Sequence, residues 1–166
     1  MIIIAPLSKV TSLATEHKVS HALSLLAPGT EFPELGLGAN HLRMEFHDIT
    51  DDREGHVPPG RAHMEEILRF AAQWPKRDPL LIHCWAGVSR STASAYASMC
   101  LLHPDHDEQA LALELRAASP EATPNLRLIK HADDILGRKG RMVKAIEALG
   151  RGAEAFEGSV VRWELK

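Results

Sequence analysis

Short apolar runs and alternating patterns along the first half of the chain predict β-strands. The isoleucine-rich residues 2–5 end at Pro6, and the largely apolar residues 19–26 also have the length of a strand. In residues 41–48, apolar and polar side chains alternate with a period of two, which is typical of a strand with one buried face. Residues 80–83 begin with three consecutive aliphatic side chains, which predicts a buried strand.

Helical periodicity separates these strands and dominates the second half of the chain. Apolar side chains recur at helical spacing in residues 7–17 and 61–74. Further helices are expected over residues 92–102, 125–137 and 141–149. Another helix is expected to end at Ala118 and to begin at a cap formed by Asp105 or Asp107. The glycines and proline of residues 31–40 predict a loop, as do the polar residues 48–60. The tail, residues 151–166, has no clear period, although residues 160–163 are a candidate for a late strand.

This order of elements predicts an α/β fold. Parallel strands need long crossover connections, and the helices between the predicted strands supply them. We therefore expect a central, mostly parallel sheet of four to five strands flanked by helices, followed by an all-helical second half. The length of 166 residues favours a single domain over residues 1–166, with the tail from residue 151 left without an assigned element.

Composition and charge exclude several classes of function. A hydrophobic content of 45% and a charged content of 25% are typical of globular proteins. The net charge of −3 provides no general attraction to nucleic acid or to an anionic membrane, so neither is expected as a partner. Two cysteines are too few for a disulfide framework and fit a reducing compartment. Without a signal-peptide pattern or a membrane-spanning apolar run, the expected localisation is cytoplasmic.

The stretch from His83 to Ser91 joins the predicted strand 80–83 to the following helix and contains the candidate chemistry. Five residues separate Cys84 from Arg90, which is enough for a turn that directs several backbone N–H groups to one point. Such a turn at a helix N-terminus binds anions. The N–H groups and Arg90 would also favour the thiolate form of Cys84, which is the nucleophilic form.

The polar side chains of this stretch suit a phosphate. The planar guanidinium of Arg90 can hold two oxygens of a phosphate at once. The Ser91 hydroxyl can donate to the cysteine sulfur and stabilise it as a leaving group, and His83 can order the loop through hydrogen bonds. The sequence therefore predicts an anion pocket with a nucleophile at its floor.

The motif His-Cys-x-x-Gly-x-Ser-Arg-Ser at residues 83–91 resembles the active-site signature of the cysteine-dependent protein tyrosine and dual-specificity phosphatases. The chain is most similar to the dual-specificity and bacterial tyrosine-phosphatase-like members. The resemblance implies a phosphatase-type catalytic domain that hydrolyses phosphomonoesters through a phosphocysteine intermediate, with no metal and no other cofactor. It implies that Cys84 is the nucleophile and that the phosphate-binding loop consists of Trp85, Ala86, Gly87, Val88, Ser89 and Arg90.

The resemblance also implies a general acid, an aspartate on a loop about thirty residues before the cysteine that protonates the leaving oxygen. Asp48 directly ends the predicted strand at residues 41–48, which suits a fixed position, and is the first candidate. Asp51 and Asp52, which stand 33 and 32 residues before Cys84, have the more usual separation and remain alternatives.

Two further polar features have an ordinary structural interpretation. Asn125 follows Pro124 and precedes a predicted helix, and bacterial members of the phosphatase family have a similar Pro-Asn at the start of a late helix. Asn125 either caps the helix, or it supports the phosphate loop or positions the hydrolytic water. His103 and His106 have the spacing of metal ligands, but Pro104 between them predicts a surface turn, and no metal site is expected.

The alternatives to a phosphatase are a rhodanese-like sulfurtransferase and a non-catalytic phosphate-binding module. The loop of a sulfurtransferase usually lacks the Ser-Arg-Ser ending, and a module without activity normally loses the cysteine or the acid. The loop has Trp85, Ala86 and Val88 where phosphoinositide-directed relatives tend to have lysines. The expected partner is therefore a phosphorylated protein or a small phosphoester, and the sequence makes no prediction of the oligomeric state.

Overall fold

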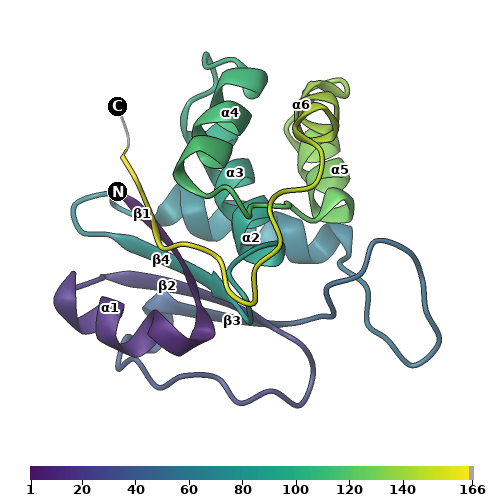
Figure 1. Cartoon of the computed structure of the whole chain (residues 1–166). Helices are drawn as coiled ribbons and strands as arrows, with labels where there is room; N and C mark the ends of the chain where they lie inside the picture. Colours follow the sequence, from purple (N-terminus) through teal and green to yellow (C-terminus); the bar gives the residue numbers. More distant parts are fainter. Residues whose placement is uncertain (165–166) are drawn as a thin grey trace.

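A five-stranded sheet forms the central layer of the molecule (Figure 1). The structure is a computed structural model that describes residues 1–164. The sheet order is β3-β2-β4-β1-β5, in which the first four strands run parallel and β5 pairs antiparallel with β1. The mostly parallel sheet predicted from the sequence is confirmed. The strands are β1 (Ile2–Pro6), β2 (His21–Leu26), β3 (His41–Glu45), β4 (Leu80–Cys84) and β5 (Val161–Trp163).

Helices cover both faces of the sheet, but unequally. Figure 1 shows α1 on one face and α3 to α6 on the other, where α2 also packs against α3 and α5. The side chains of α3 from its first residue to Cys100 are all buried, so α3 is the central helix of the thicker layer. The helices are α1 (Val10–Glu16), α2 (Arg61–Gln73), α3 (Arg90–Leu102), α4 (Glu108–Ala118), α5 (Leu126–Ile135) and α6 (Arg141–Leu149), with short 3-10 turns at Leu7–Lys9 and Gly38–Asn40.

The end of the chain corrects the expectation of an all-helical second half. Residues 150–160 return from α6 to the sheet, where β5 pairs with β1 and Ile3 lies opposite Arg162. Val161 and Trp163 are buried, while Arg162 between them is exposed, so β5 has the alternation of an edge strand. The late strand expected near residues 160–163 is confirmed.

Two predicted boundaries near the motif at residues 83–91 are wrong by two or three residues. β3 ends at Glu45 instead of Asp48, because the His47 N–H donates to the Val57 carbonyl and turns the chain into the following loop. α3 begins at Arg90 instead of Thr92, so Arg90 belongs to the first turn of the helix.

The alternation along β4 separates two neighbouring side chains of the predicted site. Leu80, Ile82 and Cys84 face the thicker helical layer and belong to its core. Leu81 belongs to the smaller core under α1, and His83 shares that side of the strand. Cys84 and His83 therefore lie on opposite faces of the sheet, although they are adjacent in the sequence.

Candidate active site

The turn between β4 and α3, residues 85–89, is held from outside through its carbonyl oxygens. Four of them accept hydrogen bonds from backbone N–H groups of distant segments, and the donor–acceptor pairs are Leu7 to Trp85 (3.0 Å), Gly158 to Ala86 (2.8 Å), Thr123 to Val88 (2.9 Å) and Asn125 to Ser89 (3.2 Å). The C=O and N–H of one trans peptide point in opposite directions. Carbonyls that point outward therefore turn the N–H groups of the next residues inward, and none of the hydrogen bonds described for residues 1–164 uses these N–H groups.

Glycine is required at one position of this turn. Gly87 has a φ of +72°, and a Cβ there would lie 2.7 Å from the Pro6 nitrogen. The backbone of the turn can pass this close to β1 only without a side chain.

Cys84 lies at the floor of the turn as the last residue of β4. Its side chain is buried, and its Sγ is 3.2 Å from the Ser91 Oγ in the first turn of α3. The sequence-based pairing of the Cys84 sulfur with the Ser91 hydroxyl agrees with this contact.

Arg90 is buried at the rim of the same turn without an acidic partner. Its Nη1 donates to the Phe46 carbonyl at 2.9 Å, just beyond the end of β3. Its Nε is buried and has no partner within residues 1–164, and no ion pair described there includes Arg90. Buried charged groups are costly unless they are paired, so the arrangement fits a site that binds an anion.

His83 supports the turn from the other face of the sheet. It is fully buried, with its Nε2 2.5 Å from the Ser24 Oγ and its Nδ1 3.4 Å from the Cys84 carbonyl oxygen. Burial lowers the pKa of His83 from 6.5 to about 4, so the ring is neutral at pH 7.

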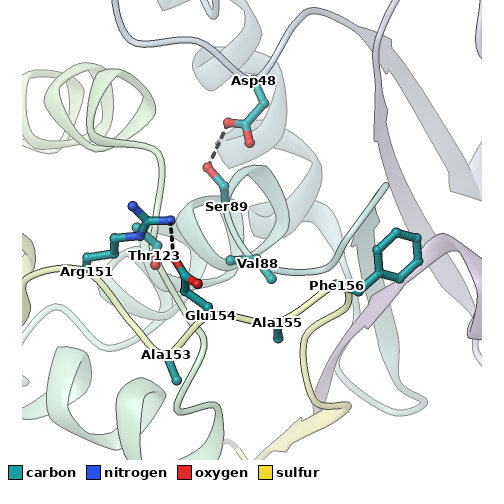
Figure 2. A pocket seen from close by; sticks show the side chains of 9 residues that line it. All are labelled: Asp48, Val88, Ser89, Thr123, Arg151, Ala153, Glu154, Ala155 and Phe156. Carbon is teal, nitrogen blue, oxygen red and sulfur yellow. Dashed lines mark hydrogen bonds and ion pairs between the residues drawn. The ribbon is translucent and has the colours of Figure 1, made fainter.

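Of the three candidate acids, Asp48 lies against the turn. Its Oδ1 accepts from the Ser89 Oγ at 2.7 Å and from the Asn125 Nδ2 at 2.8 Å, and Figure 2 shows the first of these bonds. Asn125 also accepts from the Leu128 N–H at 3.1 Å, so it caps α5 and supports the loop at once. The predicted cap is therefore confirmed, and the Asn125 N–H also bonds to the Ser89 carbonyl of the turn.

Asp51 and Asp52 lie on the side of the loop that faces α5. Asp52 forms an ion pair with Arg127 at 2.8 Å, and Asp51 lines a pocket next to Lys130. Neither carboxylate has a described hydrogen bond to the turn at residues 85–89. The geometry thus favours Asp48 among the three.

The chain between α6 and β5 forms one wall of a cleft beside the turn, and we call residues 151–159 the strap. The cleft has a volume of about 810 Å³. Phe156 of the strap is 87% exposed, and Figure 2 shows it on the opposite side of the cleft from Asp48. The lining residues are Asp48, Val88, Ser89, Thr123, Arg151, Ala153, Glu154, Ala155 and Phe156.

The strap is bonded to the turn and was not predicted from the sequence. The Gly158 N–H donates to the Ala86 carbonyl, and a Cβ on Gly158 would lie 2.8 Å from the Gly87 oxygen. The strap has no helical or strand period, so hydrophobic patterning cannot detect it. Its glycines, Gly152 and Gly158, are the only local signal of a close backbone approach.

Two remaining features of the sequence, the histidine pair and the second cysteine, lie away from this site. The rings of His103 and His106 are 4.7 Å apart in the turn after α3, and within residues 1–164 no group of three or more potential metal ligands occurs. Cys100 is buried in α3, and burial raises the pKa of its thiol to about 12.

Over residues 1–164, no helix has the length and hydropathy needed to cross a bilayer.

Comparison with known proteins identifies the fold. No protein-family model and no curated protein matches the sequence. The crystal structure of DUSP15 matches with a TM-score of 0.65 at 18% identity, over 89% of each chain. The Yvh1 phosphatase domain from Chaetomium thermophilum matches with a TM-score of 0.59 at 19% identity, over 85% of this chain and 93% of that one. PTPMT1 in complex with PI(5)P matches with a TM-score of 0.61 at 16% identity, over 87% and 93%. The chain has the fold of the cysteine-dependent phosphatases.

Within this phosphatase fold, the motif at residues 83–91 spans the end of β4, the turn and the start of α3. The architecture implied by the sequence motif is confirmed.

The contact between Gly158 and the turn predicts the effect of adding one methyl group to the strap. Gly158→Ala places a Cβ against the Gly87 oxygen, which forces the strap away from the turn and removes the bond to Ala86. We expect binding of inorganic phosphate, measured by calorimetry, to weaken about threefold to tenfold. Ala117→Ser, which changes an exposed side chain of α4 away from the cleft, is the control. Equal affinities of Gly158→Ala and wild type would contradict a supporting role of the strap.

The lowered pKa of His83 predicts a pH-dependent stability. The unfolded chain takes up a proton at His83 below pH 6.5, whereas the folded chain does so only near pH 4. The stability from this group is complete above pH 6.5 and decreases by about 3 kcal/mol as the pH falls to 4. Urea unfolding between pH 7 and pH 4.5 should show a smaller decrease for His83→Gln than for wild type, and parallel decreases would contradict the assignment.

Proposed function

We propose that this protein is a metal-independent phosphomonoester hydrolase that forms a phosphocysteine intermediate on Cys84. The observation that supports the proposal is the turn at residues 85–89, whose outward-bonded carbonyls turn its N–H groups inward between the buried Cys84 and the buried Arg90. Such an arrangement stabilises the equatorial oxygens of a phosphoryl group in the transition state, and it requires no further cation. The fold shared with DUSP15, Yvh1 and PTPMT1 supports the same reaction.

In the first step, the Cys84 thiolate attacks phosphorus, so that an S–P bond forms as the bond to the leaving oxygen breaks. Asp48 donates a proton to that oxygen. The loop N–H groups and the Arg90 guanidinium bind the three non-bridging oxygens throughout.

In the second step, water attacks phosphorus while Asp48 accepts its proton, and the S–P bond breaks to release phosphate and the thiolate. The Ser91 hydroxyl, 3.2 Å from the sulfur, stabilises the thiolate as it leaves. His83 has no chemical step and supports the loop.

The contacts of Asp48 support its role as the general acid over Asp51 and Asp52. Both donors to Asp48, from Ser89 and Asn125, bind the same oxygen, Oδ1. No hydrogen bond is described for its Oδ2, so this oxygen is available to exchange a proton with the substrate. Asp48 also lines the cleft beside the turn, where the leaving group would lie.

We propose a phosphorylated protein or a small phosphoester as the substrate. The loop has no lysine to pair with a second phosphate, and Trp85 is 56% exposed at its edge. The mechanism requires a free thiol, which suits a reducing compartment such as the cytoplasm.

Hydrolysis of p-nitrophenyl phosphate in the presence of EDTA tests the function. Wild type should turn over, and Cys84→Ser should not. Asp48→Asn should lower kcat by about 10²-fold and remove the basic limb of its pH profile, because the general acid must be protonated. Asp51→Asn/Asp52→Asn is the matched control and should stay within about twofold of wild type.

Other outcomes separate the alternatives. Full turnover by Cys84→Ser would contradict the phosphocysteine mechanism. If the pH profile of Asp48→Asn keeps its basic limb, the general acid is Asp51 or Asp52 instead of Asp48. Binding of vanadate without turnover would indicate a phosphate-binding module. Turnover of thiosulfate instead would indicate a rhodanese-like sulfurtransferase.

A further inference from the structure

Three polar side chains form a continuous row across the sheet beneath the turn. They come from three adjacent strands, with His41 on β3, Ser24 on β2 and His83 on β4. The Ser24 Oγ lies 2.7 Å from the His41 Nε2 and 2.5 Å from the His83 Nε2. Ser24 and His83 are fully buried on the α1 side of the sheet, where their neighbours are otherwise apolar.

The row has one consistent arrangement of protons. The Cys84 carbonyl only accepts, so the His83 Nδ1 must carry a proton to bond with it at 3.4 Å. The ring is neutral because burial lowers its pKa to about 4, which leaves the His83 Nε2 as an acceptor. The Ser24 hydroxyl therefore donates to His83.

The same reasoning continues outward to His41. Since the Ser24 proton points to His83, its oxygen accepts from the His41 Nε2–H. The His41 Nδ1 is then unprotonated, and it is buried without a partner within residues 1–164. A buried acceptor without a partner is less costly than a buried donor, so this assignment agrees with the environment of His41. We call the series from His41 through Ser24 to His83 the relay.

We call the turn at residues 85–89 the anion loop. At the inner end of the relay, His83 contacts the peptide between Cys84 and Trp85, which leads into this loop. The Cys84 carbonyl and the Trp85 N–H belong to one planar peptide and point in opposite directions. A donor that fixes the carbonyl on the α1 side therefore directs the Trp85 N–H toward the interior of the turn, where the Cys84 sulfur lies. The opposite tautomer of His83 would turn a lone pair of Nδ1 toward the carbonyl and repel it.

We propose that Ser24 and His41 are positioning residues of the anion loop, which hold His83 in its Nδ1–H tautomer and so orient the Trp85 N–H toward the thiolate and the bound phosphate. The proposal rests on the proposed function only in taking the loop as the anion site. Neither residue touches substrate.

The charges around the relay favour its neutral state near pH 7. Arg90 and His41 are the charged or titratable groups that act on His83, and both lower its pKa. At the outer end, burial is the main cause that lowers the pKa of His41; Arg43 lowers it further, and Glu34 raises it. Protonation of either ring would add a donor without an acceptor, so the relay is intact only when both rings are neutral.

Two measurements test the relay without requiring turnover. Nitrogen-15 NMR of the histidine rings in wild type should show the proton of His83 on Nδ1 and that of His41 on Nε2. The rate of Cys84 alkylation by iodoacetamide as a function of pH reports the fraction of thiolate. In Ser24→Ala the midpoint of this profile should rise by about 0.5 to 1 pH unit, since the thiolate loses one oriented donor.

Matched variants distinguish positioning from packing. Ser24→Thr keeps the hydroxyl and should restore the alkylation profile. Ser98→Ala removes a similarly buried serine, whose Oγ donates to the Ser94 carbonyl at 2.8 Å, and should leave the profile unchanged. Where p-nitrophenyl phosphate is hydrolysed, Ser24→Ala should lower kcat/KM about tenfold, and His41→Leu should lower it less, because Ser24 can still donate to His83.

The relay is wrong if wild-type His83 has its proton on Nε2, a result that does not depend on how any variant folds. It is also wrong if folded Ser24→Ala has the alkylation midpoint of wild type. Absence of turnover with the predicted tautomers and the predicted alkylation shift would reject the proposed hydrolase while leaving the relay supported.

Discussion

The outward bonding of four carbonyl groups is the constraint on which the site depends. A nine-residue motif cannot by itself turn its N–H groups inward, because an isolated turn samples many backbone conformations. Here, the carbonyls of the turn accept hydrogen bonds from backbone N–H groups of three separate segments. These segments are the start of the chain, the loop before α5 and the strap. The N–H groups of the motif are therefore turned inward only when segments more than one hundred residues apart in the sequence are brought together.

The parallel sheet divides the two neighbouring residues at the end of β4 between separate environments. Cys84 faces the helical layer, where Ser91 and the start of α3 lie close to its sulfur. His83 faces the smaller core under α1, where burial keeps it neutral. The proposed nucleophile and the neighbouring histidine are thus on opposite faces of one strand, and the His83 Nδ1 lies 3.4 Å from the Cys84 carbonyl oxygen.

Asn125 and the strap connect the site to the helical layer in a similar way. Asn125 begins α5, accepts from its first turn and donates to Asp48, so the position of the candidate acid depends on the position of this helix. The strap returns from α6 to pair β5 with β1, and on its way it closes one side of the cleft. Both contacts bring segments from beyond residue 120 against a motif that lies in the middle of the chain.

Local patterns in the sequence determined much of this protein. The period-two and aliphatic runs predicted β1 to β4, the helical runs predicted α1 to α6, and the motif at residues 83–91 identified the loop with Cys84 and Arg90. These features are visible because each depends on neighbours within a few residues along the chain. Only the tertiary structure decided which aspartate lies against the loop, that Asn125 has two roles, and that Ser24 and His41 stand behind His83. Those contacts join residues 17 to 77 positions apart, and no periodicity records which distant side chains the packing of sheet and helices will bring within hydrogen-bonding distance.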